Sequence, residues 1–396
     1  MTESVRAIDP TSVPLALYVH IPWCERKCPY CDFNSHEQFD PALEGDYVAA
    51  LLEDLSQQLS SGGSDSDSTR LLKRDLTSVF IGGGTPSLFS GGAIGELLEG
   101  IDQLMSLGNA EVTLESNPGS AESSRYSDYR AAGVNRLSIG VQSFNDASLK
   151  QLGRVHDADQ GRQATQLAAR YFDRVNLDLM HGLPEQDVST AMSDLEEAIA
   201  RCSGHLSWYQ LTIEPNTAFW SRPPEIPVED VLADIQDAGE LTLNSAGFQQ
   251  YEVSAWCQPG QESRHNLNYW TFGDYLGIGA GAHGKLTQTD GAIIRTRRTR
   301  LPADYLAAIR ADKPIISAPI TEADLSGEFM LNVLRLKAGA ARDLFIQRTG
   351  LTPDALEPML SRLQQRGLMA PDADIFKTTD LGFRFLNEVI GEFLGE

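Results

Sequence analysis

The chain has 396 residues, of which 41% are hydrophobic and 22% charged, so it can bury a large core without disulfides and is not disordered. Its 55 Asp and Glu against 32 Lys and Arg give a formal charge of −23, which disfavours general binding to nucleic acid or to an anionic membrane. No apolar run reaches the roughly 18 residues of a membrane span, and the first residues lack a secretory-signal pattern, so we expect a cytoplasmic protein.

Short strand-like runs alternate with longer amphipathic segments after residues 1–16, which we expect to form a flexible tail. Six strands, each followed by a helix, imply parallel pairing with right-handed crossovers. This order predicts the α/β class and a partial (β/α)6 TIM-like barrel, whose chemistry lies in the loops after the carboxyl ends of the strands. The predicted strands are 17–21, 78–81, 111–115, 136–141, 175–180 and 206–213, and the intervening helices include 46–59, 92–104, 147–152, 160–171 and 189–201.

The pattern changes in the second half of the chain. A helix at 228–246 and accessory strands near 251–256 and 275–279 complete a unit that we place at 17–300. Residues 301–396 form a mostly helical, winged-helix-like domain, with a hairpin at 368–378. Because this part is net acidic, we expect a lid or docking domain and not a DNA reader. The low-complexity stretch 60–69 (SSGGSDSDST) is typical of a flexible insertion without chemistry.

Three cysteines follow the first predicted strand directly. Cys24, Cys28 and Cys31 have the spacing C-x3-C-x2-C. Three thiolates on one loop can each hold one iron of a cubane cluster and leave the fourth iron open, where the amine and carboxylate of a small molecule can chelate it. The alternative is a zinc site, but a fourth ligand at the usual spacing is missing, and His36 is the one local candidate.

This cysteine motif, with Tyr30 before the third cysteine, resembles that of the radical S-adenosylmethionine (SAM) superfamily. A second mark is the segment GGGTP at 82–86, after the second strand. Glycines let backbone groups approach a ligand closely, and in the superfamily this segment meets the methionine amino group. The resemblance implies a radical SAM barrel with one [4Fe-4S] cluster on the three cysteines and SAM on the open iron.

Further polar residues stand at strand ends. A carboxylate there suits ribose hydroxyls and a guanidinium suits a carboxylate, although a structural ion-pair network is the alternative for each residue singly. Together they resemble the SAM pocket of the oxygen-independent coproporphyrinogen III oxidase family, and this resemblance runs from Tyr18 to the C-terminus. It implies a cofactor pocket made of Tyr18, Tyr30, Phe33, Gly83, Gly84, Thr85, Glu115, Gln142, Arg154 and Asp178.

Two branches of that family compete. The decarboxylating enzymes resemble C-x3-C-x2-C-x-C, but Phe33 stands where they carry another cysteine, and the chain before Tyr18 is shorter than theirs. The segments IPWCERKCPYCDFNSH, LSWYQLTIEPNT and HNLNYW instead resemble the HemW-type heme chaperones, in which H-N-x-x-Y-W is associated with heme binding. This resemblance implies a heme site at His265, Asn266, Tyr269 and Trp270.

The chemistry of these residues permits heme binding. A neutral imidazole such as His265 is a good axial ligand, and Tyr269 and Trp270 can flank a porphyrin face; the alternative is a histidine that caps a loop beside core aromatics. His20 alternates with apolar neighbours, so we expect it to face the cluster or cofactor, or to be structural. His283 stands in a glycine-rich turn that can border the SAM site. The basic residues Arg295, Arg297, Arg298 and Arg300 either receive propionates or form a solvated face.

The resemblance therefore implies a heme chaperone that passes heme to apo-hemoproteins, such as membrane respiratory enzymes or a heme-storage protein. A second hypothesis is SAM-dependent oxidative decarboxylation of coproporphyrinogen III, and a third is a scaffold with a degenerate cluster. The absent fourth cysteine and the H-N-x-x-Y-W segment count against the second, and the intact cysteine and glycine motifs count against the third. The heme acceptor, the fate of SAM and the oligomeric state stay open.

Overall fold

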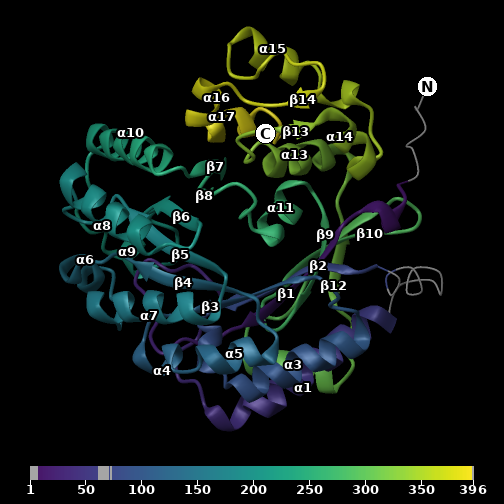
Figure 1. Cartoon of the computed structure of the whole chain (residues 1–396). Coiled ribbons are helices and arrows are strands. Elements are labelled where there is room, and N and C mark those ends of the chain that lie inside the picture. Colours follow the sequence, from purple (N-terminus) through teal and green to yellow (C-terminus); the bar gives the residue numbers. More distant parts are fainter. Residues whose placement is uncertain (1–7, 61–70, 72–73, 395–396) are drawn as a thin grey trace.

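Six parallel strands, β1 to β6, form the barrel that the alternation predicts (Figure 1). The computed structural model describes residues 8–60, 71 and 74–394, and within them each of these strands pairs with the next along the chain. Their bounds are β1 (Leu15–Ile21), β2 (Leu76–Gly83), β3 (Glu111–Ser116), β4 (Arg136–Gln142), β5 (Arg174–His181) and β6 (His205–Gln210). The predicted α/β class and partial barrel are therefore confirmed.

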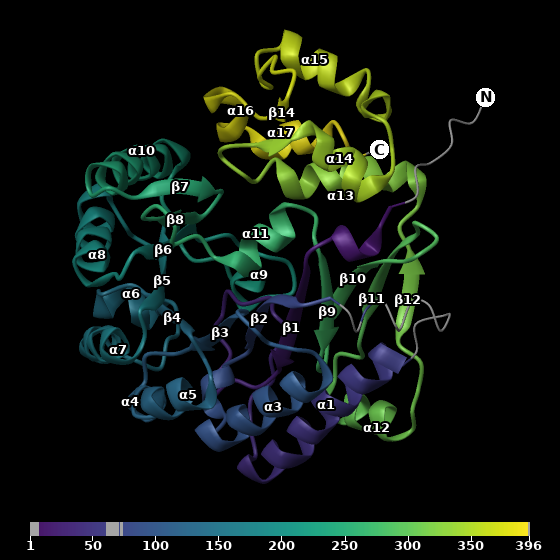
Figure 2. The same cartoon turned by 45° about the vertical axis from the view of Figure 1, so that its right-hand side comes forward.

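Alternation along the strands separates an apolar outer face from a polar inner face. On β1, Val19 and Ile21 belong to the barrel core, whereas Tyr18 and His20 line the interior of the barrel. Helices cover the outer face (Figure 2). Asp157 and Gln160 form a capping box at the start of α7, which fixes where that helix begins. The outer helices are α1 (Glu44–Ser60), α3 (Gly91–Leu104), α4 (Ser120–Ser123), α5 (Tyr126–Ala132), α6 (Asp146–Gln151), α7 (Ala158–Tyr171) and α8 (Val188–Arg201).

Additional strands extend the sheet at both edges. Beyond β6 lie two antiparallel strands, and α10 (Glu229–Ser245) packs on α8 beside them. Beyond β1 lies a parallel strand, β9, followed by an antiparallel ribbon of β10, β11 and β12 that the strand patterns did not predict. The bounds are β7 (Gln249–Glu252), β8 (Ala255–Cys257), β9 (Asp274–Ile278), β10 (His283–Thr287), β11 (Ile293–Arg297) and β12 (Ile316–Pro319).

The C-terminal helices pack around a second hydrophobic core above the barrel (Figure 1). Phe329, Phe345 and Phe376 meet edge to face at its centre. Strand β14 pairs with β13, and a bridge joins Met369 to Thr378 where the sequence predicts a wing. The bounds are α13 (Glu322–Val333), β13 (Ala340–Ala341), α14 (Arg342–Thr349), α15 (Met359–Gln365), β14 (Ile375–Phe376), α16 (Asp380–Arg384) and α17 (Leu386–Gly391).

The two ends of the predicted barrel unit differ in detail from the structure. Helix α12 (Pro302–Arg310) places Tyr305 and Ile309 in the barrel core, and β12 pairs with β11, so we propose a division between β12 and α13 instead of at residue 300. At the other end, Ile8 and Val13 are buried in the second core, which differs from the flexible tail predicted for this part. Burial of these apolar side chains fixes the segment.

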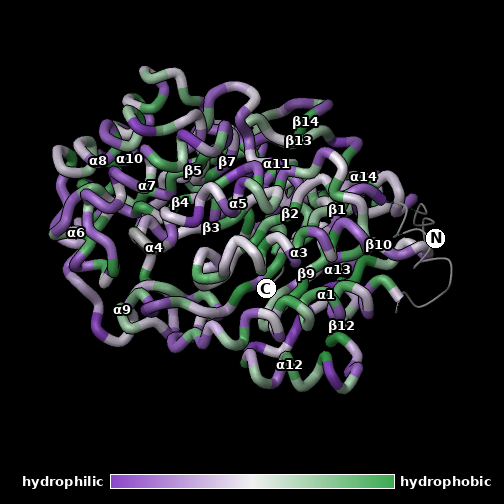
Figure 3. Tube along the Cα trace, turned by 60° about the horizontal axis from the view of Figure 1, so that its bottom comes forward, coloured by the Kyte–Doolittle hydropathy of each residue, from purple (hydrophilic) through white to green (hydrophobic). Residues whose placement is uncertain are grey.

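Hydrophobic residues follow the central strands, and hydrophilic residues follow the outer helices and loops (Figure 3). Among the described residues, no helix is both long enough and apolar enough to span a bilayer. Residues 61–69 of the predicted flexible insertion lie outside the described residues.

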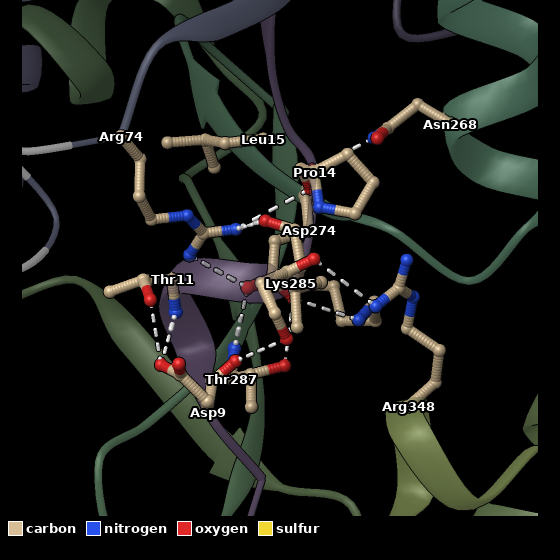
Figure 4. Close-up of polar contacts among 12 residues, drawn as sticks. Asp9, Thr11, Pro14, Leu15, Arg74, Asn268, Asp274, Lys285, Thr287 and Arg348 are labelled. Carbon is tan, nitrogen blue, oxygen red and sulfur yellow. Dashed lines mark hydrogen bonds and ion pairs between the residues drawn. The ribbon is translucent and has the colours of Figure 1, made fainter. Parts of the chain in front are cut away.

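A buried charge cluster joins the barrel to the segments around it (Figure 4). The Asp274 carboxylate is fully buried and accepts from Arg74 and Lys285, each at 2.9 Å, and from Thr287. Burial alone would raise the pKa of Asp274, but Lys285 and Arg74 hold it below its ordinary value. The Asp274 carbonyl accepts from Asn268 of helix α11 (Arg264–Trp270) at 2.8 Å, so the cluster also fixes that helix.

Candidate functional site

A cavity of about 500 Å³ lies at the carboxyl ends of the barrel strands. The strand order brings together residues that stand far apart in the sequence, because the carboxyl ends of parallel strands meet at one edge. The predicted residues that line this cavity are Cys24, Cys28, Tyr30, Cys31, Phe33, Gly83, Gly84, Thr85, Glu115, Gln142, Arg154 and Asp178. Tyr18 is not among them.

The cysteine loop is held to the barrel by its backbone. Cys24 N donates to His36 O at 2.9 Å, and Thr85 N donates to Trp23 O at 2.6 Å. Within the part of the chain that the structure describes, no three His, Cys, Asp or Glu side chains gather around one metal-ion position. A cubane cluster bonds each thiolate to a different iron, so its three cysteines do not have to converge on one metal position.

The glycine segment packs too tightly for side chains. Gly83 has φ +119°, and a Cβ there would lie 2.7 Å from the His20 ring. A Cβ on Gly84 would collide with the Trp23 carbonyl. Glycine is therefore required here, and it leaves the backbone of this segment bare toward the cavity.

Two half-buried carboxyl groups face the same cavity. Gly83 N donates to Glu115 Oε2 at 3.1 Å, and Ser138 and Asn176 donate to Asp178 at 2.9 and 2.8 Å. Burial, followed by the neighbouring Asp178, raises the pKa of Glu115 from 4.5 to about 8. At neutral pH the Glu115 carboxyl is therefore largely protonated and can both donate to and accept from a hydroxyl group.

Arg154 connects the cluster end of the cavity to the strand ends. Its guanidinium donates to Cys28 Sγ at 3.5 Å, to Asn117 Oδ1 at 2.7 Å and to Gly140 O at 2.8 Å. The Arg154 side chain also lines the cavity itself. Asn117 was not predicted, although it follows Glu115 at the same strand end.

Gln142 adopts φ +67° at the bulged end of β4, an unusual conformation for a residue with a side chain. Tyr209 holds its amide by donating to Oε1 at 2.8 Å. Tyr209 was also not predicted as a site residue. Neighbouring residues of a strand face opposite sides, so the apolar Trp208 on β6 could have indicated that Tyr209 faces the cavity.

A second, larger cavity of about 980 Å³ adjoins the first. Phe33, Gly83, Glu115, Asn266 and Trp270 line both cavities. The larger cavity has aromatic walls and a basic end, and its further lining includes Tyr18, His20, Asn34, Phe80, His265, Tyr269, Tyr275, His283, Arg297, Arg298, Arg300 and Ile316. Tyr18 therefore lies in the larger cavity and not in the predicted SAM pocket. It pairs with Phe80, two residues before the His20–Gly82 pair and so deeper in the barrel.

Helix α11 carries the four residues of the predicted heme motif to this cavity. His265 is 4% exposed, its Nδ1 shares a hydrogen bond of 3.1 Å with Ser78 Oγ, and its ring stacks on Phe80 at 4.7 Å. Tyr269 meets this imidazole edge to face at 4.8 Å. Burial lowers the pKa of His265 to about 3, so the imidazole is neutral.

The rest of α11 is anchored from outside the motif. The Arg335 guanidinium lies 4.4 Å over the Trp270 ring, and Asn266 Nδ2 donates to Tyr251 Oη at 3.3 Å. Local sequence patterns predict neither contact, because Tyr251 belongs to β7 and Arg335 follows α13, in other elements of the fold.

The four predicted basic residues separate into two pairs. Arg295 binds Tyr275 and Glu328, and Arg298 is paired with the buried carboxylate of Asp54. Arg297 and Arg300 are exposed and line the larger cavity. His283, predicted beside the SAM site, is among the residues that line the larger cavity and not among those that line the smaller one.

Comparisons with known proteins add family information to this geometry. The family model described as radical SAM superfamily matches residues 18–198, and the one described as HemN C-terminal domain matches residues 320–385. The second match begins directly after β12, where the pairing of the barrel sheet ends.

Several curated relatives span nearly the whole chain. The heme chaperone HemW of Escherichia coli (strain K12) is 47% identical over 385 residues, which cover 97% of this chain and 99% of the relative. The heme chaperone HemW of Haemophilus influenzae is 46% identical, with coverage of 98% and 100%. Among solved structures, the coproporphyrinogen III oxidase HemN from Escherichia coli superposes with a TM-score of 0.80 over 99% of this chain and 91% of that one. At 20% identity, this match shows a shared fold.

Proposed function

Because the chain belongs to the family of HemW heme chaperones within the radical SAM superfamily, we propose that it binds heme in the larger cavity and passes it to apo-hemoproteins. The observation that carries this proposal is the cavity of about 980 Å³, whose aromatic walls and basic end match a flat, apolar molecule with two carboxylates. As acceptors we propose membrane respiratory enzymes or a heme-storage protein.

Membership of the superfamily implies a [4Fe-4S] cluster and SAM, and we assign both to the smaller cavity. Cys24, Cys28 and Cys31 would hold the cluster, with Arg154 donating to the Cys28 sulfur. When bound, the cluster supplies an electron that can break a carbon–sulfur bond of SAM. The five free cysteines of the described chain suit a reducing, cytoplasmic setting.

The remaining residues of the smaller cavity would bind and orient SAM. The bare backbone at Gly83 and Gly84 can reach the methionine amino group, and Thr85 closes that end. Glu115 and Asp178 face the cavity as partners for ribose hydroxyls. The Arg154 guanidinium suits the SAM carboxylate, while Tyr30 and Gln142 complete the walls.

The heme motif would supply walls of the larger cavity. Tyr269 and Trp270 present ring surface to a porphyrin, and Asn266 and Trp270 lie where the two cavities meet. Phe33 stands at the same boundary with 59% of its surface exposed. In the decarboxylating branch a cysteine occupies this position. The exposed aromatic ring of Phe33 therefore favours porphyrin binding over decarboxylation.

The test is anaerobic and uses the cluster-reconstituted full chain. One sample receives SAM, a reductant and coproporphyrinogen III, and the porphyrin products are separated by chromatography. A matched sample receives one equivalent of heme and is scanned for a shifted Soret band, and apomyoglobin is then added as a heme acceptor. We expect heme binding and transfer without decarboxylation.

Two tryptophan variants give a matched comparison. Trp270→Ala removes cavity wall and should weaken heme binding, whereas Trp220→Ala removes a 57% exposed ring outside both cavities and should not. Turnover of coproporphyrinogen III would refute the proposal and assign the chain to the decarboxylases. Equal heme affinity of the two variants would refute the choice of cavity.

A further inference from the structure

One wall of the larger cavity is the antiparallel ribbon of β10, β11 and β12. Its register pairs His283 with Arg297, and Arg297 with Ile316. Residues that pair directly across antiparallel strands present their side chains on the same face. A histidine, an arginine and an isoleucine that is 47% exposed therefore stand in one row, and all three line the cavity.

The three histidines of this cavity differ in how many of their ring nitrogens are hydrogen-bonded. His20 uses both ring nitrogens, one with Tyr18 Oη at 3.0 Å and the other with Asn34 O at 2.8 Å. His265 uses Nδ1 with Ser78 and is stacked and buried. Within residues 8–60, 71 and 74–394, neither ring nitrogen of His283 has a hydrogen-bond partner, and the side chain is exposed. An imidazole with an unengaged ring nitrogen on a cavity wall is able to bind iron.

The two exposed arginines of the cavity have no carboxylate partner among the described residues. Arg295 and Arg298 are neutralised by Glu328 and Asp54. Arg297 and Arg300 form no ion pair within the described part of the chain, although the protein has a formal charge of −23. Two unpaired guanidinium groups at one end of an apolar cavity make a site for two carboxylates.

The cysteine loop fixes this basic end in place. Asn34 Nδ2 donates to Ala280 O and to Arg300 O, each at 2.9 Å, and Arg300 Nε donates to Asn34 Oδ1 at 3.4 Å. Asn34 follows Phe33, so one short segment positions both the aromatic ring between the cavities and the Arg300 backbone.

From these observations, and resting on the proposed function, we propose that the ribbon recognises heme, with His283 as an iron ligand and Arg297 and Arg300 as partners of the two propionates. The His283 imidazole would then bind the iron, and the two guanidinium groups would bind the carboxylates. Ile316 would contact the apolar ring of the same ligand. His265 is a positioning residue in this arrangement, because its contacts with Ser78, Phe80 and Tyr269 hold the neighbouring wall.

The experiment measures binding of three probes to the full chain: hemin, hemin dimethyl ester, which lacks free carboxylates, and protoporphyrin IX, which lacks iron. His283→Ala should abolish the axial-ligand signature of hemin in electron paramagnetic resonance and Soret spectra, and added imidazole should restore it. Its affinity for protoporphyrin IX should change by less than about twofold, since no ligand bond is involved.

The double variant Arg297→Gln/Arg300→Gln should bind hemin and protoporphyrin IX at least about tenfold more weakly, and the dimethyl ester unchanged. Arg310→Gln is the matched control, because that residue pairs with Asp46 on the surface away from the cavity. Cluster content and circular dichroism equal to those of the wild type establish that each variant is folded.

Three outcomes overturn the inference. Loss of the axial signature in His265→Ala, with retention in His283→Ala, would make His265 the ligand. Equal weakening of the acid and ester probes in the double arginine variant would refute propionate binding. If the wild type binds none of the probes, the proposed function fails as well, whereas wild-type binding that no ribbon variant alters refutes the ribbon assignment alone.

Discussion

Removal of the Asp274 charge should destabilise the protein strongly. Asp274→Asn keeps the shape of the side chain but leaves Arg74 and Lys285, which are 5% and 2% exposed, without their counter-charge. Loss of one partner of a buried ion pair costs about 3–5 kcal/mol, because a charge stays buried without compensation. The amide also cannot accept at both former oxygen positions. Either the bonds from Lys285 and Thr287 Oγ1 or those from Arg74 and Thr287 N are therefore lost with the charge.

The assay is a thermal unfolding scan. For 396 residues the entropy of unfolding is about 0.8 kcal/mol/K, so the expected decrease in Tm is about 4–6 °C. Asp46→Asn is the matched control, since Asp46 and Arg310 form a 3.0 Å pair whose side chains are 63% and 66% exposed. That pair should contribute less than about 1 kcal/mol, or about 1 °C.

The pH dependence supplies a second check on the same variant. The pKa of Asp274 is lower in the folded chain than its ordinary value of 3.8, so the stabilisation is present above that value and is lost as the pH falls through and below it. The Tm difference between wild type and Asp274→Asn should therefore narrow in acid. Equal Tm values for Asp274→Asn and Asp46→Asn at neutral pH would refute the reasoning from burial.

Three further outcomes are expected. Cys24→Ala should lose cluster iron and sulfide, measured by chemical analysis, whereas Cys202→Ala should retain both; retention by Cys24→Ala would remove the cluster assignment. The raised pKa of Glu115 predicts that stability decreases as the pH rises from about 4.5 to about 8, since the folded chain holds a proton that the unfolded chain releases. Glu115→Gln should flatten this pH dependence in thermal scans. An unchanged slope would assign the pH dependence to another titrating group. Phe329→Ala should lower the free energy of unfolding by about 3–5 kcal/mol in urea titrations, because the ring is fully buried against Phe272 and other rings; a loss below about 1 kcal/mol would contradict tight packing there.

The sequence by itself determined the barrel and most of the smaller cavity. Alternation with period two assigns each residue of a strand to one face, and parallel order brings the strand ends to one edge, so Glu115, Gln142 and Asp178 could be expected beside the cysteine loop. Local spacing was enough because Cys24, Cys28 and Cys31 lie on one short segment.

Only the tertiary structure decided the larger cavity. The depth of Tyr18 in the barrel depends on its pairing with Phe80, and the row of His283, Arg297 and Ile316 depends on the register of three strands. The four neighbouring arginines have the same local chemistry in the sequence. They differ in the structure because distant carboxylates neutralise Arg295 and Arg298, whereas the other two form no ion pair within the described ranges. Such long-range pairing leaves no trace in local periodicity.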